Sequence, residues 1–187
     1  MQLQHEDLAP SAWVCRFAPL IAPGGRVLDL ACGQGRHARY LAGLGYRVEA
    51  VDRDGTALAT LAGVTGVETR SADLEAAPWP CGAGRFDGVV VTNYLHRPLI
   101  AALLDALRPG GVLIYETFAL GNEKLGRPSN PEFLLRPGEL LQWVAGRLNV
   151  IAFEQGAVER PKPAVIQRIC AALRGTEHCR LDAGQDF

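Results

Sequence analysis

Short apolar runs alternate along the chain with stretches that place apolar side chains at helical spacing. Five of these runs are predicted to be strands, and the first of them is apolar on both faces, as expected for an interior parallel strand. They are residues 27–31, 46–51, 67–71, 86–92 and 112–117. Strands that alternate with helices predict a parallel sheet with helices on both faces and right-handed crossovers.

The predicted helices begin and end at residues that favour such positions. Ser11 can cap the first helix, over 11–21, and Asp54 a short helix that runs to Leu61. Gly45 ends a helix that follows the first strand, and Pro98 and Pro137 open two more. The fourth helix is expected to stop at Pro109-Gly110-Gly111. The inward faces would carry Trp13, Phe17 and Leu20; Tyr40, Leu41 and Leu44; Leu99, Leu103 and Leu107; and Leu140, Leu141, Val144 and Leu148.

Two more apolar runs, 149–157 and 164–173, complete the predicted sheet. Only residues 158–163 separate them, so no crossover helix fits and they should pair antiparallel. The expected fold is α/β: a doubly wound, mostly parallel seven-stranded sheet that closes with a C-terminal antiparallel hairpin. A chain of 187 residues favours a single domain over 1–187, with a loose polar tail after Arg174.

Composition excludes several classes of protein. Hydrophobic residues make up 48% of the chain and charged residues 21%, with net charge −1, so no global field attracts nucleic acid or a membrane surface. No apolar run approaches the roughly 20 residues of a membrane span, and no signal-peptide pattern opens the chain, so a cytoplasmic location is expected. The five cysteines contain no Cys-x-x-Cys pair, which favours reduced thiols. Cys170, His178 and Cys179 lack a fourth ligand at the usual spacing, and no metal site is predicted.

Glycines after the first predicted strand mark the main candidate site. Gly33 and Gly35 belong to a G-x-G-x-x-G/A pattern, and Asp52 follows Gly33 at nearly the spacing of an acid that binds a dinucleotide ribose. A dehydrogenase is therefore one alternative. Asp29 argues against it, because a carboxylate beside the turn would repel an anionic pyrophosphate and attract an ammonium group. S-adenosylmethionine carries an ammonium and a sulfonium and no phosphate.

The run Arg-Val-Leu-Asp-Leu-Ala-Cys-Gly-Gln-Gly-Arg at 26–36 resembles motif I of class I S-adenosylmethionine-dependent methyltransferases. Ordered matches follow at 50–54, 72–75, 86–93 and 107–113. The resemblance covers about 26–117 and implies a Rossmann-like fold, S-adenosylmethionine as the cofactor and a reversed strand in the terminal hairpin. One departure is Ala31, where the commonest motif has glycine; its methyl group narrows the turn without closing it.

The resemblance assigns cofactor-binding roles on the first two strands. Asp29 would hold the ammonium group, directly or through water. The alternative is a helix-capping or core-bonded carboxylate, although an unpaired acid in an apolar strand is costly and so is rarely incidental. Gly33 and Gly35 would let the backbone approach the methionine part. Asp52 would accept hydrogen bonds from both ribose hydroxyls.

The third and fourth strands would supply the rest of the cofactor site. Asp73 would meet the adenine amino group with Leu74 beside the ring, and Asn93 would lie below the methionine part. The alternative for Asp52 and Asp73 is that they simply end strands at solvent, since Asp favours such turns.

Residues after the fourth strand should face the zone of methyl transfer, because ligands of open parallel sheets bind at the carboxyl ends of the strands. His96 could act as a general base if the acceptor must lose a proton, or it could be a packed histidine ahead of Pro98. Tyr94 could orient the acceptor or contact the sulfonium by a cation–π interaction. The Asn93 to His96 run lacks the prolines of the Asn-Pro-Pro-Tyr signature, which disfavours an adenine amino group as acceptor.

A long segment without clear periodicity, 118–136, is rich in Gly, Pro and Asn and predicts an ordered loop. Together with 93–98 and 115–141 it resembles a group of small bacterial methyltransferases, and motif I is more loosely similar to tellurite-resistance methyltransferases. The loop is interpreted as an acceptor-side element. The candidate acceptor-binding residues are Arg97, Glu116, Asn122 and Arg127.

The sequence favours methyl transfer to a small-molecule acceptor, by a monomer or homodimer without membrane contact. An RNA or protein methyltransferase is the alternative, with recognition by the loop and by the basic residues Arg160, Lys162, Arg168, Arg174 and Arg180. A non-catalytic protein that binds S-adenosylmethionine is a third. Residues 1–22 would form an N-terminal helix or lid, and 149–173 the terminal hairpin.

Overall fold

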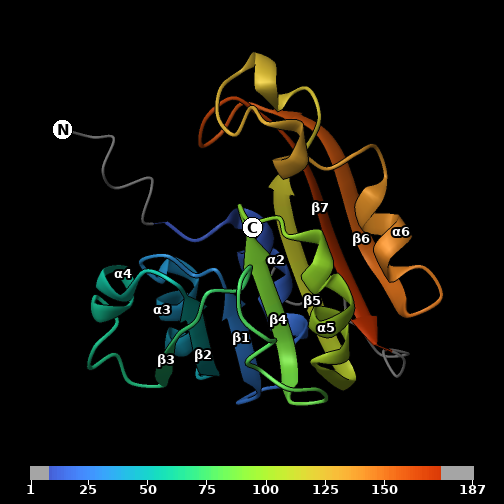
Figure 1. The fold of residues 1–187 in the computed structure, drawn as a ribbon. Helices are drawn as coiled ribbons and strands as arrows, with labels where there is room; N and C mark the ends of the chain where they lie inside the picture. Colours follow the sequence, from blue (N-terminus) through green and yellow to red (C-terminus); the bar gives the residue numbers. More distant parts are fainter. Residues whose placement is uncertain (1–8, 174–187) are drawn as a thin grey trace, which may run out of the picture.

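The computed structural model describes residues 9–173 of the chain. The predicted tail, with Arg174, His178, Cys179 and Arg180, and the first part of the predicted lid lie outside these residues. Within them, seven strands form one sheet in the order β3-β2-β1-β4-β5-β7-β6 (Figure 1). The strands are β1 Arg26–Leu30, β2 Arg47–Asp52, β3 Val67–Ser71, β4 Phe86–Thr92, β5 Leu107–Phe118, β6 Leu148–Val158 and β7 Ala164–Leu173.

Strands β1 to β5 pair parallel, and β7 is inserted antiparallel between β5 and β6. The predicted doubly wound sheet with its C-terminal antiparallel hairpin is therefore confirmed. The order steps from β1 outward to β2 and β3 on one side and to β4 and β5 on the other. That reversal at β1 and β4 opens a crevice at their carboxyl ends, where open α/β sheets bind ligands.

Short helices cover both faces of the sheet. They are α2 Ala12–Phe17, continued by a 3₁₀ turn Ala18–Leu20, α3 Arg36–Gly43, α4 Gly55–Ala59, α5 Ile100–Asp105 and α6 Glu139–Val144. Further 3₁₀ turns span Arg97–Leu99, Asn122–Lys124 and Pro131–Phe133. Both predicted caps are confirmed: the Ser11 hydroxyl accepts the Trp13 N–H, and the Asp54 carboxylate accepts the Thr56 and Ala57 N–H groups. Within residues 9–173 no helix is long and apolar enough to cross a membrane.

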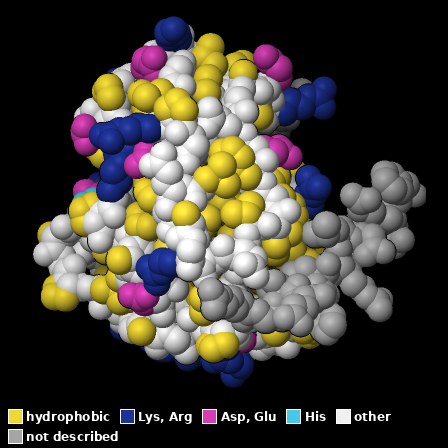
Figure 2. All heavy atoms as spheres, turned by 90° about the vertical axis from the view of Figure 1, so that its right-hand side faces the viewer, with side chains coloured by type: hydrophobic (Ala, Val, Ile, Leu, Met, Phe, Trp, Pro, Cys, Tyr) yellow, Lys and Arg dark blue, Asp and Glu magenta, His cyan; other side chains and the backbone are white. Residues whose placement is uncertain are grey.

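The core consists of two apolar clusters, one on each face of the sheet. Helices α2 and α3 pack on one face through residues such as Trp13, Phe17 and Leu41. Helices α5 and α6 pack on the other through residues such as Leu103 and Leu140. Figure 2 views the side that carries β6 and α6, where hydrophobic side chains gather and Val150 of the edge strand is 46% exposed.

Some of the predicted inward positions and boundaries are wrong. Leu44 is 49% exposed, because it is the C-cap residue beyond the last turn of α3, and Leu141 on α6 is 37% exposed. The fourth helix ends at Asp105, and Leu107 already begins β5. Phe86 pairs with Leu107 and Gly88 with Val112, so residues 108–111 bulge within a strand instead of ending a helix. Leu148, which was predicted to lie on the last helix, is instead the first residue of β6.

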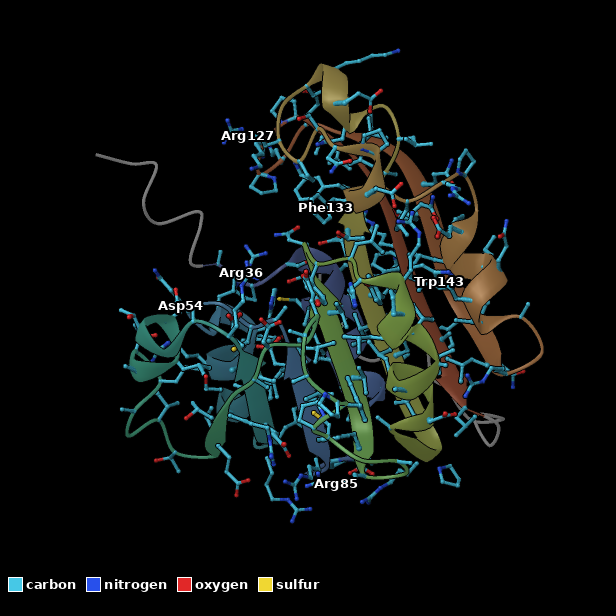
Figure 3. The ribbon with its side chains drawn as sticks, in the orientation of Figure 1. Arg36, Asp54, Arg85, Arg127, Phe133 and Trp143 are labelled. Carbon is cyan, nitrogen blue, oxygen red and sulfur yellow. The ribbon has the colours of Figure 1, made fainter. Side chains whose placement is uncertain are left out.

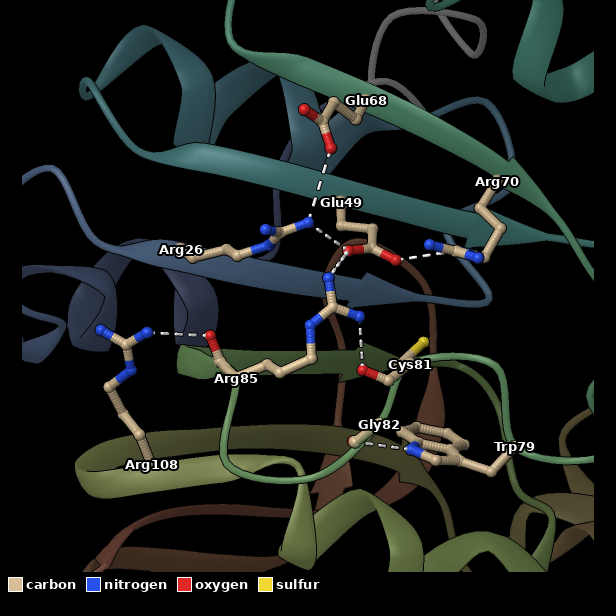
Figure 4. Close-up of polar contacts among 9 residues, drawn as sticks. All are labelled: Arg26, Glu49, Glu68, Arg70, Trp79, Cys81, Gly82, Arg85 and Arg108. Atoms are coloured by element: carbon tan, nitrogen blue, oxygen red, sulfur yellow. Dashed lines mark hydrogen bonds and ion pairs between the residues drawn. The ribbon is translucent and has the colours of Figure 1, made fainter.

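The connection from β3 to β4, residues 72–85, contains no helix, so part of the sheet face lies under a loop. Glu49 of β2 occupies this region, 2% exposed, and pairs with three arginines: Arg26 at 2.7 Å, Arg70 at 2.8 Å and Arg85 at 3.4 Å (Figure 4). Arg85 also donates a hydrogen bond to the Cys81 carbonyl, 2.7 Å away. The network fastens the connecting loop to the sheet where a helix is missing.

Candidate cofactor and acceptor site

A cavity of about 370 Å³ lies at the carboxyl ends of the parallel strands. Its walls come from the segments that follow β1, β2, β3 and β4, from the end of β5 and from the loop after β5. They are Ala31, Asp52, Arg53, Ala72, Asp73, Leu74, Glu75, Asn93, Tyr94, Leu95, Thr117, Phe118, Pro128 and Phe133. Four of the seven predicted cofactor-binding residues therefore share one cavity: Asp52, Asp73, Leu74 and Asn93.

The turn from β1 to α3 depends on left-handed backbone conformations. Gly33 has φ 54° and Gly35 φ 74°, and a Cβ at Gly35 would lie 2.5 Å from Leu61 side-chain atoms. Gly35 therefore needs glycine both for its dihedral angle and for space. Ala31 adopts φ 52°, a conformation that costs a non-glycine residue roughly 1–2 kcal/mol. The backbone thus keeps the path that glycine would take in the commonest motif, and Ala31 lines the cavity.

Asp52 connects the end of β2 to this turn. Its Oδ2 accepts a hydrogen bond from the Gly33 N–H at 2.7 Å, and its Oδ1 accepts one from the Asp54 N–H at 2.9 Å. A carboxylate offers about four lone-pair positions, so each oxygen keeps capacity for a hydroxyl donor in the cavity. The arrangement fits a ribose.

The ends of β3 and β4 form the neighbouring wall. Asp73 Oδ1 accepts hydrogen bonds from the Glu75 and Ala76 N–H groups at 2.9 and 3.2 Å, and these bonds hold the pKa of Asp73 below its usual value. Leu74 is buried and presents an apolar surface to the cavity. Asn93 has φ 56°, and its N–H donates to the Glu116 carbonyl at 2.9 Å. An acidic group beside an apolar side chain suits an adenine ring with its amino group.

Asp29 lies behind the turn and is 1% exposed, so it does not form part of the cavity wall. Burial raises its pKa to about 7, although the Ala38 N–H and the charge of Arg36 act in the opposite direction. Its Oδ2 is buried and has no hydrogen-bond partner among the described residues. A buried acid with an unused oxygen favours a cationic ligand group nearby and supports the fit to the ammonium of S-adenosylmethionine.

Asp29 should make stability depend on pH. Because its folded pKa of about 7 lies above the ordinary 3.8, the unfolded chain releases this proton first, and folding stability falls as pH rises from 4 to 7. Relative to Asp29→Asn, the free energy of unfolding of the wild type should fall by up to roughly 4 kcal/mol over that range. Urea unfolding of both proteins at several pH values measures this difference, and parallel pH profiles would contradict it.

His37, which the sequence did not single out, joins the turn to the N-terminal segment. Its Nε2 accepts the Ser11 N–H at 3.0 Å, and its Nδ1 lies 3.3 Å from the Thr92 hydroxyl. Burial, aided by the charge of Arg36, lowers the pKa of His37 to about 3, so the ring is neutral and Nδ1 donates to Thr92. The partners are distant in sequence, and no local pattern could have revealed them.

Glu116 takes a supporting place instead of lining the cavity. Its Oε1 accepts the Ser11 hydroxyl at 2.8 Å, and its Oε2 lies 3.3 Å from Arg168. Ser11 thus bridges His37 on α3 and Glu116 on β5. These bonds hold the segment at Ser11 against α3 and β5.

Of the two candidate catalytic residues, Tyr94 and His96, one lines the cavity and the other does not. Tyr94 lines the cavity, and its hydroxyl is buried without a hydrogen-bond partner in the described part of the chain. Burial, reinforced by Glu75 and Asp73, raises the pKa of Tyr94 to about 12, so the phenol stays protonated. His96 does not line the cavity, and its influence is on Asp73, whose pKa its charge lowers.

Arg97 and Asn122 hold the long loop instead of facing an acceptor. Arg97 makes two hydrogen bonds to the Glu139 carboxylate, at 2.7 and 3.0 Å, and donates to the carbonyls of Glu132 and Leu134 at 2.6 and 2.9 Å. Asn122 is buried and bonds the Pro128 carbonyl at 3.1 Å and the Val165 N–H at 3.2 Å. The loop instead lines the cavity with Pro128 and Phe133, next to Phe118 at the end of β5. The sequence signal that could have identified this wall is the presence of aromatic residues in a loop beside the strand ends.

Arg127, the fourth candidate, is exposed and does not line the cavity. Figure 3 shows Arg127 and Phe133 above the strand ends, on the side of the loop that faces Arg36 and Asp54.

Arg97→Lys should loosen the loop without altering the cofactor side. An ammonium group cannot reproduce the forked contact with Glu139 together with both carbonyl bonds, so we expect a loss of about 1–3 kcal/mol of stability. Hydrogen exchange at the Leu120 and Leu135 amides, which tie the loop ends together, should accelerate. Affinity for S-adenosylhomocysteine should stay within about twofold. Arg127→Lys, in the same loop, is the matched control, and equal effects of both variants would contradict the prediction.

Comparison with known proteins finds similarity to methyltransferases. Residues 27–111 match the family model described as a methyltransferase domain. The matched residues run from β1 into β5 and include the turn with Gly33 and Gly35, so this part of the chain is similar to a methyltransferase domain.

The curated relatives match this chain over only part of their own length. An uncharacterised methyltransferase from Synechocystis is 36% identical over 121 residues, which cover 59% of this chain and 51% of that protein. The chain spans about half the length of the curated relatives that it matches.

Among solved structures, TehB from Haemophilus influenzae has a TM-score of 0.73 at 21% identity, covering 88% of this chain and 63% of TehB. The 1,6-didemethyltoxoflavin-N1-methyltransferase of Burkholderia thailandensis has a TM-score of 0.66 at 22% identity, covering 91% and 80%. These likenesses show the shared fold.

Proposed function

We propose that this chain transfers a methyl group from S-adenosylmethionine to a nucleophilic atom of a small acceptor. The observation that carries the proposal is the single cavity that places Asp52, Asp73 and Leu74 beside an aromatic wall from the 118–136 loop. One side offers polar groups for a nucleoside, and the other offers an apolar surface for a second molecule. A volume of about 370 Å³ lies within the range of small-molecule sites.

The chain's own residues would bind and align the reactants. Asp52 would hold the ribose and Asp73 the adenine amino group, while Leu74 packs on the ring. Asp29 would balance the ammonium group from behind the turn. The bound cofactor supplies an electrophilic methyl group on a sulfonium. Alignment by Asn93, Tyr94 and the loop is then the main catalytic contribution, and positioning of this kind can supply about 7–11 kcal/mol.

A small acceptor agrees with the small molecule that is bound in one structural neighbour. The Burkholderia thailandensis enzyme was crystallised with 1,6-didemethyltoxoflavin and S-adenosylhomocysteine, and this chain covers 80% of it. We infer an acceptor of similar size from the aromatic lining, and not an identical acceptor.

Thermal unfolding with added ligand tests the cofactor part of the proposal. S-adenosylhomocysteine should raise the unfolding temperature in proportion to its saturation, and NAD should not. Formation of a methylated product from radiolabelled S-adenosylmethionine and a small-molecule fraction tests the transfer. Binding without any product from any acceptor would favour a non-catalytic cofactor-binding protein.

The RNA alternative makes a different prediction. Of its basic residues, Arg168 is already paired with Glu116 and Glu154, and Lys162 lies 5.9 Å from the Phe118 ring. Steeply salt-dependent binding to RNA would favour that alternative. Methylation of a protein fraction would favour the protein branch.

A further inference from the structure

The acceptor end of the cavity is distinct from the end that carries Asp52 and Asp73. It is lined by Thr117, Phe118, Pro128 and Phe133, together with Tyr94 and Leu95. Phe133 is 49% exposed although it is a large aromatic residue, and it is presented by the loop that Arg97 and Glu139 hold (Figure 3). An exposed aromatic side chain at the mouth of an aromatic and apolar pocket favours a flat, apolar partner that stacks on it.

None of the described side chains at this end is suited to remove a proton from the acceptor. Among the described residues that line the cavity, the ionisable groups are Asp52, Arg53, Asp73, Glu75 and Tyr94. Asp52 and Asp73 accept backbone hydrogen bonds at the cofactor end, and Glu75 follows Asp73 by two residues in the same segment after β3. The raised pKa of Tyr94 keeps its phenol protonated. The acceptor atom should therefore bring a lone pair that is available at neutral pH.

The charges around the cavity favour a neutral acceptor over an anionic one. Three acidic residues, Asp52, Asp73 and Glu75, line it with one basic residue, Arg53. An anion entering the cavity would be repelled, whereas positive charge that develops on the acceptor would be stabilised. The unpaired Tyr94 hydroxyl supplies a neutral dipole in the same wall.

We propose, on the basis of the proposed function, that the acceptor is a small planar heteroaromatic compound methylated on a neutral ring nitrogen. The nitrogen lone pair forms the new nitrogen–carbon bond as the carbon–sulfur bond breaks, and its electron pair returns to sulfur. The positive charge passes from the sulfonium to the ring, and no proton is transferred. Phe133 stacks on the ring and the acidic lining stabilises the cationic product.

A paired panel of compounds tests this acceptor class. Pyridine, isoquinoline and acridine would each be compared with a hydroxyarene of the same ring number: phenol, 2-naphthol and 2-hydroxyanthracene. With the full chain and S-adenosylmethionine, at least one azaarene should give its N-methyl cation at a rate at least tenfold above that of its hydroxyarene partner. The rate should be constant at high pH and fall only where the azaarene itself becomes protonated.

Two variants connect the result to the aromatic wall. Phe133→Ala should raise the KM of the preferred azaarene about tenfold, the equivalent of about 1.4 kcal/mol, and leave affinity for S-adenosylhomocysteine unchanged. Leu125→Ala, an exposed apolar residue of the same loop, is the matched control and should leave both values unchanged.

Other outcomes separate this inference from the proposed function. Preferential methylation of the hydroxyarenes, or a rate that follows an ionisation of the protein, would reject a neutral nitrogen acceptor and require a base. Tight binding of S-adenosylhomocysteine with no methylation of any azaarene would reject the acceptor class and leave the proposed function standing. Absence of S-adenosylhomocysteine binding would reject both.

Discussion

Replacement of Asp52 by asparagine should lower the affinity for S-adenosylhomocysteine by about a hundredfold or more. The carboxylate accepts the Gly33 and Asp54 N–H groups and faces the cavity, so the change weakens the turn and the ribose contacts together. Hydrogen bonds to a charged group contribute about 1.5–3 kcal/mol each, and two ribose hydroxyls would lose them. Isothermal titration calorimetry measures the loss.

Asp54→Asn is the matched control for that experiment. It removes the same charge two residues away, and asparagine caps helices as well as aspartate does, so α4 should persist. Its affinity should stay within about twofold of the wild type. Equal losses in both variants would mean that net charge, and not the Asp52 contacts, determines binding.

The second large effect concerns stability at the opposite end of the strands. Glu49→Gln should cost about 3–5 kcal/mol, because it leaves Arg26, Arg70 and Arg85 close together without the buried charge that pairs them. Urea unfolding measures the change. Glu68→Gln is the control, since the Glu68 side chain is 81% exposed at 3.5 Å from Arg26 and should contribute at most about 1 kcal/mol.

The pH dependence of Glu49 has the opposite sign to that of Asp29. Burial alone would raise the pKa of Glu49, but hydrogen bonds from Arg26 and Arg70 and the charge of Arg85 hold it below its ordinary 4.5. Its stabilisation is therefore complete above pH 4.5 and is lost as pH falls through the lower folded value. If Glu49→Gln and the wild type differ equally at pH 3 and pH 7, this explanation is wrong.

Local patterns in the sequence predicted the fold well. The bounds of β3 and β4 are those predicted, and Ser11 and Asp54 cap their helices as expected. Each of these features depends on a few adjacent residues. Residues 108–111 show the limit of such patterns, because Pro-Gly-Gly commonly ends a helix. Here Leu107 has already entered β5, where it pairs with Phe86, and that pairing is not visible in the local sequence.

Local sequence also predicted which residues at strand ends lie together in the candidate site. Asp52, Asp73, Leu74 and Asn93 sit at strand ends, and the topology brings strand ends together. Arg97 was predicted to bind the acceptor because it follows β4, but its guanidinium is occupied by Glu139, 42 residues further along. Which polar residues support the site and which line it depends on such long-range pairs.

The Arg97–Glu139 contact also determines when the loop loses its conformational freedom. Because the loop is already held by a forked ion pair, two carbonyl bonds and the buried Asn122, its entropy is lost during folding and not during acceptor binding. A compound of few atoms can then bind without having to order nineteen residues, from 118 to 136. The corresponding disadvantage is a narrow range of acceptor shapes, since a rigid aromatic wall adapts little.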